Sequence, residues 1–177
     1  MLSIYHYKND TLNGYHANYH RNGKIKRQGW YKDGNQHGEW KSYTTDGVVI
    51  QINFYHKGML HGEQLAFSGK GIKTSSSTYK YDDELKEVYY TLYGYVSYSV
   101  DYKSDKETYE LVYQHQNKKP STKATYVNGV RHGPFSYHDF YGRKVTEGEY
   151  LNGKLHGEVV WYDTNGGIDV LSSYNYG

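Results

Sequence analysis

A tyrosine recurs along this chain at a nearly constant spacing of 24 residues, and this period constrains the fold more than any other feature. One interval of 23 interrupts the series, and a single deleted residue explains it. A fixed period of this size is typical of chains built from repeated supersecondary units. The anchor tyrosines are Tyr7, Tyr31, Tyr55, Tyr79, Tyr102, Tyr126, Tyr150 and Tyr174.

Glycines follow most of the anchors at fixed distances. Those seven residues on are Gly14, Gly38, Gly62, Gly133 and Gly157, and those sixteen residues on are Gly23, Gly47, Gly71, Gly142 and Gly166. Asn-Gly and Asp-Gly pairs, as in "KDGN" and "LNGK", tolerate the positive φ that tight hairpin turns require. The segments between them are rich in Tyr, Val, Thr and Ile, as strands are. Each repeat is therefore predicted to be one β-hairpin.

The predicted fold is all-β: an elongated, twisted, single-layer antiparallel meander of hairpins of about 24 residues each. Residues 1–177 form one domain in this interpretation, with regular repeats over 7–71 and 126–177. The repeats over 72–125 are degenerate, acidic and rich in tyrosine. The stretch "YDDELKEVYYTL" leaves a short helix open as an alternative to strand, since Leu85, Val88 and Leu92 have helical spacing.

Aromatic rings are expected to cover exposed glycine backbone in such a sheet, where there is little dry interior. The recurrence of Gly38 with Trp40, and of Gly133 with Phe135, predicts two such pairs. The 24 tyrosines supply contact area that aliphatic residues supply in other proteins. Tyrosine suits a thin sheet because it buries its ring and keeps its hydroxyl in water.

Composition narrows the class of protein. The net charge of +2 gives the whole chain no pull toward nucleic acid or anionic lipid. No cysteine is present, which excludes disulfides, thiolate nucleophiles and thiolate metal sites. No apolar run is long enough for a signal peptide or a membrane span. A cytoplasmic protein is therefore expected.

The His-Gly pairs of the repeats are the most tempting candidates for chemistry. Equivalent histidines in adjacent hairpins would be two strands apart, about 9.6 Å, which is too far for one zinc ion to join them. We expect them to pack and form hydrogen bonds beside the turns. The chain also has no nucleophile elbow and no phosphate-binding loop, so neither an enzyme, a metal nor a cofactor is predicted. The histidines of the four His-Gly pairs are His37, His61, His132 and His156.

A family resemblance adds to this interpretation. The frame "NG-x-x-HGE-x-x-x-Y-x-x-x-G", as in "YLNGKLHGEVVWYDTNG" and "YKDGNQHGEWKSYTTDG", resembles the MORN repeat. More closely, it is similar to the MORN-2 variant of bacterial proteins labelled as antitoxin components of toxin–antitoxin systems. The resemblance implies successive antiparallel hairpins and a role in binding. It covers residues 7–71 and 126–177 and is weak over 72–125.

The degenerate segment is the predicted partner surface. Residues 79–110 carry eight acidic and four basic side chains together with nine tyrosines. Tyrosines anchor protein interfaces, and carboxylates speed the encounter with a basic partner. An ordinary sheet with a solvated acidic face is the competing interpretation. The predicted contact residues are Tyr81, Asp82, Asp83, Glu84, Glu87, Tyr89, Tyr90, Tyr93, Tyr95 and Tyr98.

Three functions remain open at this point. The first, implied mainly by the resemblance, is an antitoxin or immunity protein that neutralises a toxin by direct binding. The second is a structural scaffold or self-associating module, because open edge strands and exposed rings favour a homodimer. The third is binding of single-stranded nucleic acid or anionic lipid by the basic stretch "HRNGKIKRQGWYK". Its candidate contacts are Arg21, Lys24, Lys26, Arg27, Trp30, Tyr31 and Lys32.

Overall fold

The computed structural model describes residues 2–175, which divide into two compact units. The first ends at Gly94 and the second begins at Tyr95. Across residues 2–175 all regular structure is β-strand, in antiparallel hairpins, and this confirms the predicted all-β hairpin-repeat fold. The segment for which a helix was the alternative lies in a strand and its turns.

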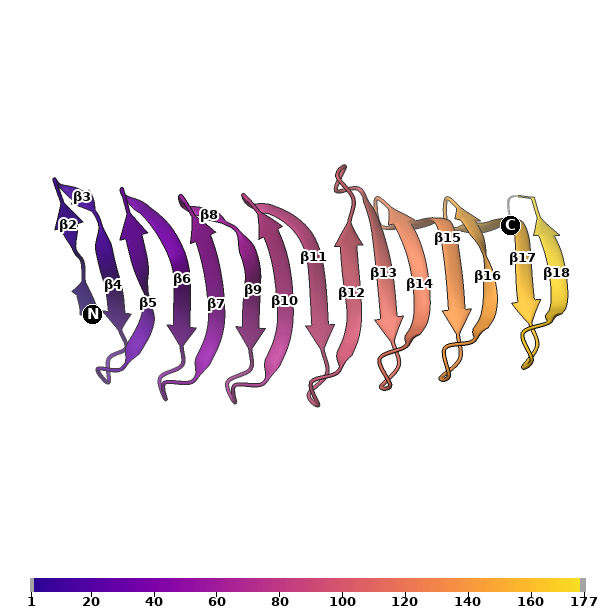
Figure 1. Ribbon diagram of the computed structural model, residues 1–177, viewed down its shortest axis with the longest axis horizontal. Helices are drawn as coiled ribbons and strands as arrows, with labels where there is room; N and C mark the ends of the chain where they lie inside the picture. The colour runs from indigo at the N-terminus through magenta and orange to yellow at the C-terminus, as the bar shows by residue number, and fades with distance from the viewer. Residues whose placement is uncertain (1, 176–177) are drawn as a thin grey trace. The chain divides into compact units, whose positions relative to one another are not determined.

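The strands of the first unit follow one another as hydrogen-bonded neighbours in nearly sequential order (Figure 1). The path is β1-β4-β5-β6-β7-β9-β10-β11, with β8 on β7 and a separate β2-β3 hairpin. The strands are β1 (Ser3–Ile4), β2 (Tyr7–Lys8), β3 (Thr11–Leu12), β4 (Gly14–Tyr19), β5 (Ile25–Lys32), β6 (Asn35–Tyr43), β7 (Val49–His56), β8 (Met59–Leu60), β9 (Gly62–Phe67), β10 (Lys73–Lys80) and β11 (Asp83–Tyr90).

The second unit is an antiparallel meander in strict chain order, from β12 to β18. Each hairpin is joined to the next by another hairpin turn, so that strands adjacent in sequence are adjacent in the sheet (Figure 1). Its strands are β12 (Val96–Tyr102), β13 (Thr108–Gln114), β14 (Pro120–Val127), β15 (Val130–His138), β16 (Lys144–Leu151), β17 (Lys154–Tyr162) and β18 (Ile168–Tyr174).

Two kinds of turn alternate along the chain. Next to most anchor tyrosines the loop has two residues, both at positive φ, as in Asp33–Gly34 with φ of 50° and 79°. Such turns match the right-handed twist of the strands. At the other end a three-residue loop closes on a backbone hydrogen bond, such as Thr44 N–H to Val48 O at 2.8 Å, with Gly47 at positive φ. Lys118 takes the position of this glycine in one loop, with φ of 69°.

Each glycine that follows an anchor tyrosine by seven residues lies directly opposite the anchor tyrosine of the next repeat. All five glycines have positive φ, which an L residue with a side chain rarely adopts. Each anchor is thus opposite a residue without a side chain, although a Cβ added to any of these glycines would have no anchor tyrosine within 4 Å. The pairs are Gly14 with Tyr31, Gly38 with Tyr55, Gly62 with Tyr79, Gly133 with Tyr150, and Gly157 with Tyr174.

Neighbouring turns are also joined to one another by backbone hydrogen bonds. Gly34 donates its N–H to Leu12 O at 2.8 Å, and Gly58 donates to Gln36 O at 2.9 Å. In the second unit Gly153 donates to Arg131 O at 2.8 Å. Because each turn is bonded to the one before it, the hairpins follow one another with a fixed offset.

A His-x-Asn-x-Lys motif links loops at the opposite edge. In "HRNGK" the His20 ring lies 3.0 Å from Tyr43 O, Asn22 donates to Thr45 O at 2.8 Å, and Lys24 donates to Asp46 O at 2.9 Å. The motif recurs in the second unit as "HQNKK", residues 115–119, whose histidine, asparagine and lysine contact the carbonyl oxygens of residues 138, 140 and 141. Only two copies of this motif occur among the repeats, and it was not among the features predicted from the sequence.

Trp40 forms the core of the first unit. Its side chain is 2% exposed and contacts the rings of His16 and Tyr31, at centroid distances of 5.5 and 5.1 Å. The Arg27 guanidinium lies 4.7 Å from the centre of the indole ring. A Cβ added to Gly29 would lie 2.2 Å from the indole, so the ring covers that glycine.

The predicted pairing of rings with glycines is correct in kind and wrong in detail. Trp40 covers Gly29 of the neighbouring strand, and a Cβ at Gly38 would meet nothing within 4 Å. Gly38 instead has φ of 70° within an irregular stretch of the β5–β6 pairing. In the second unit Phe135 packs near Gly148, where an added Cβ would lie 3.1 Å from its ring.

The core of the second unit combines a few apolar residues with a tyrosine cluster. Ala124, Phe135 and Val159 are buried. Beside them the Arg131 guanidinium donates to the hydroxyls of three tyrosines at 3.2 to 3.4 Å, and these bonds raise the pKa of Arg131. Polar side chains thus supply contacts that the thin sheet lacks. The tyrosines are Tyr126, Tyr137 and Tyr150.

The degenerate repeats keep the strand pairing of the regular ones. Tyr109 stands where the regular repeats have glycine, and it still pairs with the next anchor, Tyr126. The two rings stack at 5.2 Å with an interplanar angle of 4°.

Between residues 2 and 175 no helix is long and apolar enough to cross a membrane.

Replacing Gly29 by alanine should destabilise the first unit. The new methyl group would collide with the indole of Trp40, and overpacking of this kind costs about 1–3 kcal/mol. The matched control is Gly69→Ala, because Gly69 has open space around it and ordinary φ. Urea unfolding followed by tryptophan fluorescence measures the effect. Equal midpoints for the two variants would contradict the close packing of ring on glycine.

Candidate functional site

An exposed tryptophan marks the most pronounced groove of the first unit. Tyr15, Trp30 and His37 are cross-strand partners on β4, β5 and β6, and direct partners project from the same face of a sheet. Trp30 is 57% exposed, although large apolar side chains are normally covered. The Tyr15 ring meets it edge-on, with centroids 5.9 Å apart. This row presents three rings to solvent on one face.

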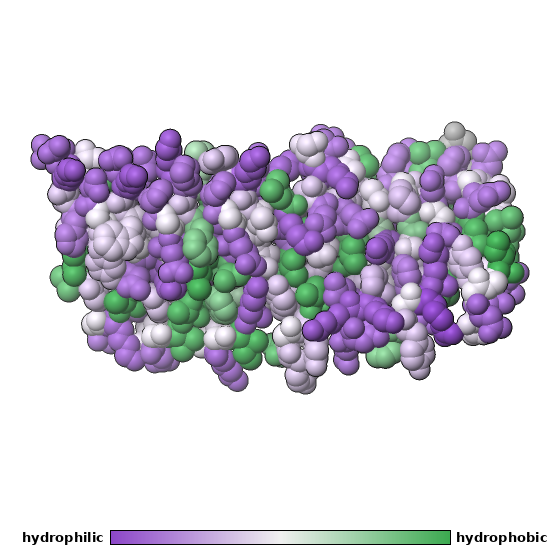
Figure 2. All heavy atoms as spheres, viewed as in Figure 1, coloured by the Kyte–Doolittle hydropathy of each residue, from purple (hydrophilic) through white to green (hydrophobic). Residues whose placement is uncertain are grey.

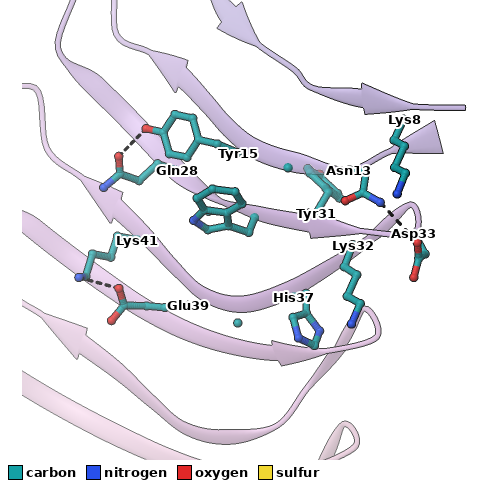
Figure 3. Close-up of a pocket in the computed structure, with 14 residues that line it drawn as sticks. Lys8, Asn13, Tyr15, Gln28, Tyr31, Lys32, Asp33, His37, Glu39 and Lys41 are labelled. Atoms are coloured by element: carbon teal, nitrogen blue, oxygen red, sulfur yellow. Dashed lines mark hydrogen bonds and ion pairs between the residues drawn. The ribbon is translucent and has the colours of Figure 1, made fainter. Parts of the chain in front are cut away.

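A second row of side chains fixes the floor of the groove. Ala17, Gln28 and Lys41 are paired across the same three strands, and Ala17 is fully buried. The Tyr15 hydroxyl donates to Gln28 Oε1 at 2.7 Å, as Figure 3 shows. Gln28 Nε2 in turn donates to the Tyr43 hydroxyl at 2.6 Å. Because Gln28 lines the groove and is held by two tyrosine hydroxyls, the floor is ordered at this residue.

The groove has a volume of about 680 Å³ and a charged rim. Lys41 forms an ion pair with Glu39 at 2.7 Å, and the hydrogen bond to this carboxylate raises the pKa of Lys41 (Figure 3). Asn13 donates to Asp33 at 3.4 Å. Lys32 also lines the groove, and no ion pair is recorded for it among the described residues. The site therefore combines aromatic rings with lysine, carboxylate and amide groups at its edge.

A row of rings extends from the groove along the two-residue turns. His37 lies 5.6 Å from His56, His56 lies 5.9 Å from His61, and His61 lies 4.6 Å from Tyr81. A second cavity of about 210 Å³ lies between the first turns of this row, lined by His37, His56 and Lys57 among others. Partial burial lowers the pKa of His56, and the charges of His37 and Lys57 lower it further.

Among residues 2–175 no group of three or more histidine or carboxylate side chains is arranged to hold a metal ion. A His-Gly histidine of the second unit packs beside a turn, as expected: the His132 ring nitrogen lies 3.3 Å from Asn152 Oδ1. That contact supports the structural role predicted for His132.

Two predicted contact residues, Tyr81 and Asp82, form the turn between β10 and β11, with φ of 53° and 67°. Asp82 accepts from Leu60 N–H at 2.6 Å and donates its own N–H to Leu60 O at 2.9 Å. This carboxylate therefore joins two hairpins. Tyr81 is 48% exposed and ends the row of rings described above.

Five further predicted residues lie on β11, where successive side chains alternate between the two faces of the sheet, so that the five do not share one face. Tyr89 and Tyr90 are consecutive strand residues and so project from opposite faces. The Tyr90 hydroxyl lies 3.3 Å from Ser76 Oγ, and the Lys73 ammonium lies 4.6 Å from the centre of its ring. The five residues are Asp83, Glu84, Glu87, Tyr89 and Tyr90.

The last three predicted residues lie in different places. Tyr93 is 84% exposed in the loop after β11. Tyr95 and Tyr98 belong to the second unit, where the Tyr98 ring lies 5.5 Å from that of Tyr113. Within the first unit, the predicted set is thus divided among a turn, both faces of a strand and a loop. Its role in binding stays a prediction.

The basic stretch proposed for nucleic acid or lipid is also divided by alternation. Trp30 and Tyr31 both line the groove, but Trp30 is 57% exposed, whereas the Tyr31 ring packs on Trp40. Arg27 stacks on Trp40, and Lys24 donates to a loop carbonyl. The sequence analysis named Trp30 only as part of that stretch. Its pairing with Tyr15 and His37 could have been found by applying the repeat register to the hairpin on either side.

The pKa of His56 gives a direct test of the ring row. Lys57→Asn removes a positive charge and keeps a residue that tolerates the φ of 52° at this turn. The pKa of His56 should rise in this variant and still remain below 6.5, because partial burial is the larger cause. Lys118→Asn, at φ 69° in another loop, is the matched control. NMR titration of the ring protons provides the measurement, and an unchanged His56 pKa would contradict the geometry.

The resemblance to MORN repeats was drawn from the spacing of a few residues. No model of a known family matches the sequence, and a search of curated proteins gave no match either. The family therefore remains a hypothesis, and the site has to be interpreted from its own geometry.

Proposed function

We propose that this chain is a non-catalytic protein-binding module that acts as an antitoxin or immunity protein, covering a partner toxin by direct contact. The groove around Trp30 is the observation that carries the binding role. Tryptophan is enriched among residues that dominate the energy of protein interfaces. The resemblance of the repeats supports the narrower role as an antitoxin.

The groove favours a partner segment of a particular chemistry. A side chain that packs against the exposed face of Trp30 would find the edge of Tyr15 beside it. Lys32 and His37 project near one another at the turn end of the groove, where both also line the second cavity (Figure 3). A segment with an apolar or aromatic anchor followed by a carboxylate fits this arrangement, because the Lys32 ammonium would pair with the carboxylate.

The proposed surface extends along the row of rings formed by His37, His56, His61 and Tyr81. It continues from the groove along the turns of three successive hairpins. A partner lying along the turns would therefore reach Tyr81, one of the residues predicted from the sequence. The cytoplasm is the compartment we propose for this binding, in line with the absence of cysteine.

Co-expression with the product of the neighbouring gene tests the proposal. The wild-type chain should restore growth and co-purify with that product. Trp30→Ala should weaken binding by about 2 kcal/mol or more, roughly 30-fold in Kd, because it removes the central ring. Titration calorimetry on the purified pair measures this loss.

The matched control is Tyr141→Ala, which removes a ring that is 69% exposed in a loop of the second unit. It should bind like the wild type. No rescue by the wild-type chain would overturn the antitoxin role. Rescue and binding that are equal for Trp30→Ala and the wild type would overturn the groove as the site.

A further inference from the structure

A cavity of about 230 Å³ lies over β7, β9 and β10 of the first unit. Among the described residues it has no lining residue in common with the groove around Trp30. Figure 2 shows hydrophilic and hydrophobic residues interspersed over the strands of this unit, on the face that is visible there. The side chains that line the cavity include Gln51, Asn53, Tyr55, Ser75, Ser77 and Tyr79.

The 24-residue period relates this cavity to the space that Trp40 fills one repeat earlier. The Trp40 ring contacts Tyr31 and Tyr55, at centroid distances of 5.1 and 6.4 Å. It also packs on the Arg27 guanidinium and covers Gly29. The cavity is the counterpart of the space that the indole occupies, because the residues 24 positions after these four neighbours all line it. They are Gln51, Asn53, Tyr55 and Tyr79.

Gln64 stands 24 residues after Trp40 and keeps its hydrogen bond but not its ring. Trp40 Nε1 donates to Trp30 O at 3.2 Å, and Gln64 Nε2 donates at 3.2 Å to the equivalent carbonyl, Phe54 O. The Gln64 amide also donates to Gly62 O at 3.2 Å and accepts from Phe54 N–H at 2.8 Å. Gln64 is 8% exposed. Because these bonds hold its amide against the backbone, the glutamine does not fill the space of the indole.

The equivalent positions of the second unit are filled by apolar side chains. Phe135 is 5% exposed and lies opposite Ala124, and Val159 is fully buried. A Cβ added to Gly148 would lie 2.9 Å from the Val159 side chain. Asn53 is the counterpart of Ala124 and Gly148 in the repeat sequence, and it carries a polar side chain where they carry a methyl group or none. The cavity thus arises where both the apolar residue and the small residue beneath it are replaced by amides.

The lining of the cavity offers neutral groups that form hydrogen bonds. Among residues 2–175 no charged side chain lines it. Amide and hydroxyl side chains such as Asn53, Ser75 and Ser77 can both donate and accept. The Tyr55 hydroxyl accepts from Arg27 Nη2 and from Asn53 Nδ2, each at 3.4 Å. Since both bonds use its lone pairs, the Tyr55 hydroxyl proton is available to a ligand.

We propose that this cavity binds one neutral pyranose ring of a carbohydrate. A pyranose carries hydroxyl groups around its edge, which donate and accept like those of serine, and its two faces present C–H groups that pack against aromatic rings. The tyrosines and the neutral polar groups of the lining match these two features. The cavity is smaller than the roughly 300–1,000 Å³ of pockets for drug-sized ligands, so a single ring is the size that fits.

NMR titration of the full chain tests the proposal with three neutral probes, the methyl pyranosides of glucose, galactose and N-acetylglucosamine. At least one of them should shift the amide signals of Asn53 and Ser77, with a dissociation constant on the order of 1 mM for a ligand of this size. Sorbitol, an open-chain polyol, should leave these signals unchanged at the same concentration, because it has no ring to pack against the tyrosines.

The double variant Asn53→Gly, Gln64→Trp copies the arrangement of Gly29 and Trp40 into this repeat. Its new indole should fill the cavity and weaken pyranoside binding at least tenfold, and circular dichroism verifies that the variant is folded. Ser77→Val provides a second, milder test, because it removes one hydroxyl of the lining and should weaken binding about fivefold. The matched control is Ser136→Val, at a half-buried strand serine of the second unit, and it should bind like the wild type.

Three results would overturn the proposal. The first is the absence of any shift at Asn53 and Ser77 with all three pyranosides, and a shift with phenol in their place would assign the cavity to an aromatic side chain of a protein. The second is an equal shift with sorbitol, which would indicate an adventitious additive only. The third is a pyranoside affinity that Ser77→Val leaves unchanged or that Ser136→Val reduces equally. None of these outcomes bears on the Trp30 groove, which has its own lining residues.

Discussion

The backbone register between successive hairpins is the constraint on which the rest of this structure depends. Two-residue turns with both φ values positive hold strand pairs in one alignment, and a one-residue slip would move every side chain to the opposite face. The register brings each glycine that follows an anchor by seven residues opposite the next anchor tyrosine, as with Gly38 and Tyr55. It also aligns Tyr15, Trp30 and His37 in one row along the groove. The same strand register therefore determines both the fold and the arrangement of the side chains in the groove.

A sheet of this kind buries little, so the contacts between neighbours have to be of several chemical types. Trp40 covers the bare backbone of Gly29, and Arg131 joins three tyrosine hydroxyls. Backbone bonds between turns and the His-x-Asn-x-Lys motif add polar contacts at the two edges. Each contact joins a hairpin to an adjacent one, as in other repeat proteins. The face of the first unit that carries Trp30 is the surface proposed for binding.

The sequence predicts the elements of this fold well, because hairpin repeats are encoded locally. The tyrosine period, the Asn-Gly turns and the second glycine of each repeat lead directly to the strands and their order. The glycine beneath Trp40 could not be chosen in this way. Gly38 forms part of an irregular pairing, and this shifts the ring onto Gly29.

The candidate site was harder to predict because it depends on which face each side chain occupies. Trp30 and Tyr31 are adjacent in sequence, and alternation leaves the Trp30 ring exposed and packs the Tyr31 ring against Trp40. Charge and tyrosine content directed attention to residues 79–110, yet Asp82 bonds to Leu60 within the fold. The composition of a segment can identify a candidate binding region, but predicting which side chains form one surface requires the register of at least three strands.

The most direct test of this account is the measurement of inter-strand backbone contacts by NMR. Nuclear Overhauser effects should connect Gly38 with Tyr55 in the first unit and Gly133 with Tyr150 in the second, since both pairs are directly opposed. Their presence together would establish a register that repeats with the 24-residue period. Contacts displaced by one residue in either pair, or a regular helix in place of these strands, would contradict it.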